Sequence, residues 1–151
     1  MTASRRDFLR QGTAVAASAA WLYAAESAHA AAEPLPVALI GPGGMGTQHL
    51  ERLVANPRVR LTTICEVDEQ RAAAAAAAVT KATGQTPRVV KDMRRVFDDA
   101  AIRAVWIATP DHWHAPAAIL AATAGKHVYV EKPCSHNLRE GRLMIDAARR
   151  H

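Results

Sequence analysis

The chain has 151 residues, of which 50% are apolar and 22% are charged, a balance typical of a globular protein rather than a disordered one. This length suffices for one domain with a hydrophobic core and is too short for two ordinary domains. The formal net charge of +5 is spread along the chain without a block of like charges, so the composition gives no support to nucleic-acid binding.

The N-terminal segment has the layout of a secretory signal. Paired arginines in residues 4–10 precede an alanine-rich run over 12–25, and residues 28–30 (Ala-His-Ala) offer the small side chains that a signal peptidase requires. The arginine pair resembles the bacterial twin-arginine type, whose export machinery moves proteins that have already folded. The run is too short and too weakly apolar to remain as a membrane anchor after cleavage.

We therefore expect three parts: a twin-arginine signal peptide over residues 1–30, a linker over 31–35 and a folded domain over 36–151. The expected location is the periplasm or another extracytoplasmic compartment of a bacterium. The alternative is a basic N-terminus in which the arginine pair arose by chance.

Strands and helices alternate along the rest of the chain. In chain order, the apolar pattern predicts strand 37–40, helix 45–55, strand 59–65, helix 69–83, strand 88–90, helix 93–97, strand 104–108, helix 114–124, strand 128–130 and helix 137–150. Asp68 and Asp92 are expected as N-caps, and Gly84 ends the long helix. Asn137 and Glu140 resemble a capping box. This alternation predicts an α/β fold built on a doubly wound parallel sheet with right-handed crossovers.

A glycine-rich motif lies between the first strand and the first helix. The run 41–46 (Gly-Pro-Gly-Gly-Met-Gly) matches G-x-G-x-x-G in the context typical of a dinucleotide site. The first glycine permits a tight turn, the second lets the backbone approach a pyrophosphate, and the third lets helix and strand pack closely. A flexible turn is the alternative. The candidate cofactor-binding residues here are Gly41, Gly43, Gly44, Met45 and Gly46.

Glu66 ends the second strand, 20 residues after Gly46. A carboxylate at this place usually accepts hydrogen bonds from the adenosine ribose and disfavours a 2′-phosphate. The expected cofactor is therefore NAD rather than NADP. The alternative for Glu66 is a solvated strand end.

A second polar loop follows the fourth strand, with the sequence Thr-Pro-Asp-His-Trp-His over residues 109–114. His112 and His114 are only two histidines without a cysteine or carboxylate constellation, so we expect no metal site. His114 either belongs to the functional site or is an early helix residue that bonds to backbone, and the residues leave both alternatives open.

Glu131, Lys132 and Pro133 follow the run 128–130, which is expected to be a buried strand. Charge is costly inside a sheet, whereas ligands bind at the carboxyl ends of parallel strands. Lys132 is therefore expected beside a substrate or cofactor. The alternative is a surface ion pair between Glu131 and Lys132 that contributes little.

Taken in order, the glycine motif, Glu66, the loop 109–114 and Glu131-Lys132-Pro133 resemble the nucleotide-binding half of the Gfo/Idh/MocA oxidoreductase family over about residues 36–150. The resemblance implies a Rossmann-like NAD(P)-binding domain with strand order 3-2-1-4-5 and a sixth strand to follow. It also implies a small-molecule sugar or polyol substrate, and a full-length form that can form oligomers.

The resemblance further implies a role for each matching residue. Gly41, Gly43 and Gly46 would meet the pyrophosphate, and Glu66 the ribose. The nicotinamide side would be lined by Thr109, Pro110 and His114. Glu131 would contact the cofactor, and Lys132 would be the catalytic lysine that meets both cofactor and substrate.

Family members continue into a second α/β domain that supplies most of the substrate pocket and the usual acid/base Asp and His. We expect this chain, which stops at His151, to be truncated and to lack that domain. Three functions stay open: an exported NAD-dependent oxidoreductase that transfers hydride to or from a sugar or polyol, an NAD-dependent glycosidase of the same superfamily, and a non-catalytic nucleotide-binding fragment.

The implied strand order also bears on the two cysteines. Cys65 ends the second strand and Cys134 follows the fifth, three strand positions away, which is roughly 14 Å at the usual spacing. A disulfide needs Cα atoms within about 7 Å. We therefore expect both thiols to be free.

Overall fold

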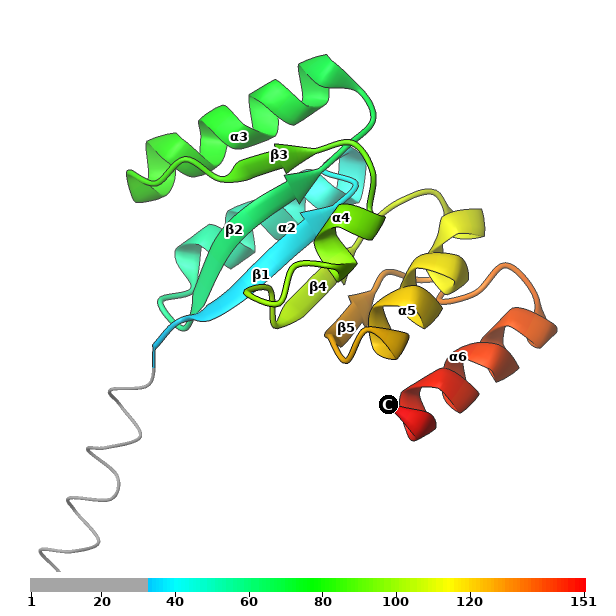
Figure 1. Cartoon of the computed structure of the whole chain (residues 1–151). Coiled ribbons are helices and arrows are strands. Elements are labelled where there is room, and N and C mark those ends of the chain that lie inside the picture. Colours follow the sequence, from blue (N-terminus) through cyan, green and yellow to red (C-terminus); the bar gives the residue numbers. More distant parts are fainter. Residues whose placement is uncertain (1–32) are drawn as a thin grey trace, which may run out of the picture. The chain divides into compact units, whose positions relative to one another are not determined.

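The computed structural model of the chain describes residues 33–151, so the predicted signal peptide and the first two residues of the predicted linker lie outside the described residues. Strands and helices alternate as predicted (Figure 1). The elements are β1 (Leu35–Ile40), α2 (Gly44–Ala55), β2 (Val59–Cys65), α3 (Glu69–Thr83), β3 (Arg88–Val90), α4 (Arg94–Phe97), β4 (Ala104–Ile107), the 3-10 helix η1 (Asp111–Trp113), α5 (His114–Thr123), β5 (His127–Val130) and α6 (Leu138–Arg150).

The five strands form one parallel sheet in the order β3-β2-β1-β4-β5, which confirms the expected strand order. Ile40 at the end of β1 is in register with Cys65 of β2 and with Ile107 of β4. The carboxyl ends of the three central strands therefore meet at one edge of the sheet. This edge is where open α/β sheets bind their ligands.

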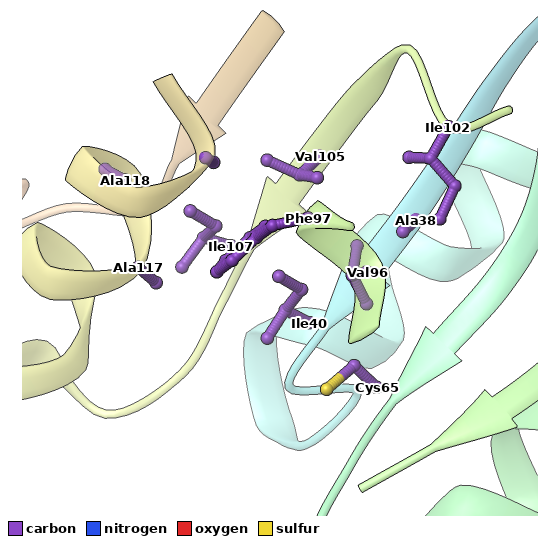
Figure 2. Packing of buried hydrophobic residues seen from close by; sticks show 11 residues of the cluster. Ala38, Ile40, Cys65, Val96, Phe97, Ile102, Val105, Ile107, Ala117 and Ala118 are labelled. Atoms are coloured by element: carbon purple, nitrogen blue, oxygen red, sulfur yellow. The ribbon is translucent and has the colours of Figure 1, made fainter. Parts of the chain in front are cut away.

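A hydrophobic core lies on each face of the sheet. Because side chains alternate along a strand, Leu39 of β1 packs with α2 and α3, while Ala38 and Ile40 pack with α4 and α5. Figure 2 shows the second cluster, in which Ile107 of β4 and Phe97 of α4 lie next to the small side chains of α5. Alanines on α5 let this helix approach the sheet closely.

The helix caps follow local sequence signals. The Asp68 side chain accepts the Arg71 N–H at 2.9 Å, and Gly84 ends α3 in the left-handed conformation with φ 72°. The Asn137 side chain likewise accepts the Glu140 N–H at 3.0 Å, which confirms the predicted cap. The Glu140 carboxylate reaches back to the N–H of residue 136 rather than to that of Asn137, so the expected capping box is displaced by one residue.

The expectation that strand 128–130 is buried is wrong. Val128 is 36% exposed and Tyr129 is 39% exposed, because β5 is the edge strand of the described sheet and pairs only with β4. Helix α6 packs against α5. Within residues 33–151, no helix combines the length and apolarity that a bilayer crossing requires.

The two cysteines are free, and they differ sharply in burial. Burial, reinforced by the nearby charges of Asp92 and Glu66, raises the pKa of the Cys65 thiol to about 12, whereas Cys134 is exposed. Since the thiolate is the nucleophile, iodoacetamide at pH 8 is expected to label Cys134 and to leave Cys65 unlabelled in the folded protein. Peptide mass spectrometry checks this, with the urea-unfolded chain as the control in which both residues react. Equal labelling of both in the folded protein would contradict the burial of Cys65.

Candidate functional site

A cavity of about 950 Å³ opens at the carboxyl ends of β1, β2 and β4. Seven of the predicted site residues line it: Gly41, Gly43, Gly44, Met45, Glu66, Thr109 and Pro110. Four others do not line it: Gly46, His114, Glu131 and Lys132. The structure therefore brings together the glycine loop, the end of β2 and the start of the loop after β4, as the positions of these motifs predict.

The glycine loop is tightly constrained by its neighbours. Gly41 has φ +83°, and a Cβ on it would lie 2.9 Å from the Ala108 carbonyl oxygen and from the Thr109 N–H nitrogen. A Cβ on Gly46 would overlap the Gly41 carbonyl oxygen. Both positions therefore exclude any side chain, and their glycines let the loop turn and let α2 pack closely against it.

Helix α2 begins at the loop with no side chain capping its first turn. Gly43 and Gly44 at this end of the helix line the cavity, and the first N–H groups of a helix have no partner within the helix. Such unsatisfied N–H groups, together with the positive end of the helix dipole, favour a phosphate. The Thr47 hydroxyl donates to the Pro42 carbonyl at 3.0 Å and so fixes the loop from beneath. The loop therefore has the features that favour an anion, and its contact with a pyrophosphate stays a prediction.

Glu66 is buried in the cavity wall. Its Oε1 accepts the N–H groups of Val67 and Asp68 at 2.8 and 3.0 Å, which orients the carboxylate at the end of β2. No hydrogen bond to Oε2 occurs within residues 33–151, so this oxygen can accept from a ligand. A smaller cavity of about 270 Å³ adjoins Glu66 and lies against Lys91 and Glu69.

The loop after β4 places Thr109 in the cavity wall and His114 behind it. The Thr109 hydroxyl oxygen is buried and has no hydrogen-bond partner among the described residues. His114, which is 2% exposed, lies 2.7 Å from the Pro133 carbonyl oxygen through Nδ1 and 2.8 Å from the Thr109 carbonyl oxygen through Nε2. His114 thus joins two loops through backbone contacts, and its contact with a cofactor stays a prediction.

Glu131 is held in a buried cluster rather than at the wall of the cavity. Its Oε1 lies 2.7 Å from His49 Nε2 and accepts the Tyr129 hydroxyl at 3.3 Å, while its Oε2 accepts the Lys132 N–H at 2.9 Å. These hydrogen bonds, that of His49 above all, hold the pKa of the Glu131 carboxyl below its usual range. The rings of Trp106 and Tyr129 stack beside His49 and Glu131, with 4.2 Å between the ring centroids.

Lys132 is exposed, and its ammonium group makes no ion pair within the part of the chain that the structure describes. The alternative of a surface ion pair with Glu131 is therefore not what the structure contains. Only the backbone of Lys132 is tied down, through the Glu131 carboxylate. The ammonium group is free to meet a ligand, and its catalytic role stays a prediction.

Two residues near these loops were absent from the sequence-based candidates. His49 occupies the buried face of α2 with Gly46, Leu50 and Leu53, an i, i+3, i+4, i+7 pattern that could have revealed it. Arg71, in the first turn of α3, lines the cavity close to Gly43, and no local pattern marks it. Among residues 33–151, no group of three His, Cys, Asp or Glu side chains is arranged to hold a metal ion.

Comparison with known proteins gives consistent matches. Residues 35–151 match the family described as "Oxidoreductase family, NAD-binding Rossmann fold" (GFO_IDH_MocA). A levoglucosan dehydrogenase of Pseudarthrobacter phenanthrenivorans is 38% identical over 124 residues, which are 76% of this chain and 30% of that protein. A glycosyl hydrolase family 109 protein of Saccharopolyspora erythraea is 33% identical over 126 residues, which are 79% of this chain and 28% of that protein.

A solved structure of levoglucosan dehydrogenase in complex with NADH and L-sorbose is similar to this fold with a TM-score of 0.67 at 36% identity, covering 78% of this chain and 32% of that one. The chain thus spans about a third of the length of the relatives that it matches. The match covers nearly all of the described residues, and the sheet order and the glycine loop agree with it. The chain therefore belongs to the Gfo/Idh/MocA oxidoreductase family and contains its NAD-binding Rossmann domain.

Proposed function

We propose that this chain is the NAD-binding domain of an exported oxidoreductase that transfers hydride between NAD and a carbon of a sugar or polyol. The observation that carries the proposal is the cavity of about 950 Å³ in which the glycine loop, Glu66 and Thr109 converge at one sheet edge. Export rests on the order of arginine pair, apolar run and small residues over 1–30. The sugar or polyol rests on relatives such as levoglucosan dehydrogenase.

The residues present fit a dinucleotide. The glycine loop would hold the pyrophosphate, since no side chain fits at Gly41 and the N–H groups of α2 are uncapped. Glu66 would accept from the adenosine ribose through Oε2, and the unpartnered Thr109 hydroxyl would meet the nicotinamide side. Bound NAD would supply the hydride-accepting ring. Lys132 would donate to the reacting hydroxyl or carbonyl of the substrate.

A second function is supported by the glycosyl hydrolase family 109 relatives, one of which is 33% identical to this chain. A glycosidase of this superfamily would use bound NAD for a transient oxidation during glycoside cleavage. The same nucleotide site serves both functions. Products separate them, because an oxidoreductase accumulates NADH and oxidised sugar, whereas the glycosidase releases a free sugar without net NADH.

Titration with NADH, followed by its fluorescence, tests the proposed nucleotide site directly. We expect the unchanged chain to bind NADH and to discriminate against NADPH. Glu66→Ala and Glu66→Gln are expected to weaken NADH binding about tenfold and to relax the discrimination, because a charge-assisted hydrogen bond to the ribose is lost.

Glu51→Ala is the matched control for Glu66, since this exposed carboxylate of α2 does not line the cavity. Its NADH affinity should stay within twofold of that of the unchanged chain. Equal affinities of the unchanged chain and the Glu66 variants would refute the ribose assignment. Circular dichroism of each variant establishes that the fold persists.

A further inference from the structure

A single cation of the nucleotide cavity is left without a carboxylate partner. Three Arg or Lys residues line the wall, namely Arg71, Lys91 and Arg94. The Lys91 ammonium pairs with Glu69 at 2.6 Å, and the Arg94 guanidinium forms two-point contacts with Asp92 at 2.7 and 3.0 Å. Within residues 33–151, Arg71 has no such partner, so its charge is available to a ligand.

Arg71 also lies at the glycine loop. Its Nη1 atom is 3.9 Å from the place that a Cβ of Gly43 would take. Gly43 is the second glycine of the motif, at which the backbone comes closest to a dinucleotide pyrophosphate. The Arg71 backbone is fixed by the Asp68 cap at 2.9 Å, so the side chain starts from a firmly held first turn of α3. The guanidinium therefore lies close to the N-terminus of α2 in the same cavity wall.

Two further charged residues of the cavity wall, Glu66 and Arg71, differ in the ligand groups that they suit. Among residues 33–151, once the two ion pairs are set aside, Glu66 and Arg71 are the carboxylate and the guanidinium of the wall that have no ion-pair partner. Glu66 offers an acceptor, which suits ribose hydroxyls and repels phosphate. Arg71 offers up to five N–H donors in a fork that suits two phosphate oxygens. A group with hydroxyls at one end and an anionic pyrophosphate next to them matches this arrangement.

We propose that Arg71 binds the pyrophosphate of the nucleotide together with the glycine loop, and that it supplies the main side-chain cation of this site. This inference rests on the proposed function. The competing role for Arg71 is recognition of a 2′-phosphate on the ribose, which would favour NADP. The two roles differ in which phosphate the guanidinium contacts, and ligands that carry only one of these phosphates distinguish them.

The experiment uses the full chain with Arg71→Gln, Arg71→Lys and the control Lys81→Gln. Lys81 lies on the same helix α3 and carries the same charge, but it does not line the cavity. Affinities for NADH, ADP, adenosine and adenosine 2′-monophosphate are measured by fluorescence and calorimetry at two salt concentrations. Arg71→Gln is expected to lower the affinity for NADH and for ADP about tenfold, and the affinity for adenosine less than twofold.

Arg71→Lys should recover part of the affinity, since it keeps the charge and loses the fork. The salt dependence of NADH binding should also be smaller in Arg71→Gln than in Lys81→Gln. Three results for Arg71→Gln would overturn the role of Arg71 and leave the proposed function standing. They are an unchanged affinity for NADH, a loss of affinity for adenosine as large as that for NADH, and a loss of affinity confined to adenosine 2′-monophosphate. Absence of NADH binding by the unchanged chain overturns both.

Discussion

Gly46→Ala is expected to destabilise the domain by about 3 kcal/mol or more and to abolish NADH binding. A Cβ at this position overlaps the carbonyl oxygen of Gly41 and comes within 3.5 Å of the Ala108 Cβ. The obstructing atom belongs to backbone, which cannot rotate away as a flexible side chain can. Either α2 moves off the sheet or the glycine loop changes its path. Both outcomes separate the N–H groups of α2 from the cavity.

Gly44→Ala is the matched control for stability, because the same methyl group is added to the same loop. No heavy atom lies within 4 Å of a Cβ on Gly44, which is the first residue of α2. Alanine favours the helix over glycine, so the free energy of unfolding should stay equal or rise by up to about 1 kcal/mol. Urea unfolding followed by circular dichroism measures both variants. If Gly46→Ala were as stable as Gly44→Ala, the close packing of helix and loop would be wrong.

The sheet could be predicted because its signals are local. Apolar runs mark the strands, and caps such as Asp68 and Gly84 mark the ends of helices within one or two residues. The exposure of β5 could not be predicted in this way. Val128 and Tyr129 belong to an apolar run that fits a buried strand as well as an edge strand. The exposure of β5 is determined by its place in the sheet, where it pairs with β4 and with no other described strand.

Some parts of the candidate site could likewise be predicted from local sequence signals, and others could not. The glycine loop, Glu66 and Thr109 line one cavity because each follows the end of a central parallel strand, a relation that sequence order already contains. The partner of Glu131 could not be predicted, since His49 lies 82 residues away and neither residue carries a spacing that points to the other. Likewise, His114 bonds to two carbonyl groups whose positions depend on how the loops fold.

The His49–Glu131 pair is expected to stabilise the domain far more than a surface pair of the same length. Its N–O distance is 2.7 Å with side chains only 5% and 10% exposed, whereas Lys91 and Glu69 are 2.6 Å apart with 63% and 78% exposed. Removing one partner of a buried pair leaves the other without its hydrogen bond and away from water. An exposed pair is already solvated and screened, so its loss costs little.

We therefore expect His49→Gln and Glu131→Gln each to lower the Tm by roughly 5–10 °C, and Glu69→Gln to lower it by less than about 2 °C. The double variant of His49 and Glu131 should lose less than the sum of the single losses, because both substitutions remove one shared interaction. Thermal unfolding followed by circular dichroism measures the four variants and the unchanged chain. Additive losses, or an equal loss in Glu69→Gln, would contradict a coupled buried pair.

The pair also links the helix of the glycine loop to the backbone of Lys132, because Glu131 Oε2 accepts the Lys132 N–H. The Lys132 amide signal in NMR spectra should therefore shift in His49→Gln, because His49 and the Lys132 N–H are joined through the Glu131 carboxylate. In Glu69→Gln, whose carboxylate contacts only Lys91, this signal should stay in place. An unmoved Lys132 signal in His49→Gln would show that the pair contributes packing alone and does not position the corner formed by Glu131 and Lys132.

The pH dependence of stability separates the charge of Glu131 from its shape. The pKa of this carboxyl is lowered in the folded state, first by the hydrogen bond from His49 and then by that from the Lys132 N–H. Its ionised form therefore stabilises the fold above the unfolded pKa of about 4.3, and this contribution is lost as the pH falls through the lower folded pKa. The Tm difference between the unchanged chain and Glu131→Gln should be largest near pH 7 and should become smaller below about pH 4. A difference that stays constant to lower pH would mean that Glu131 acts through packing, and that its charge does not hold the corner beside Lys132.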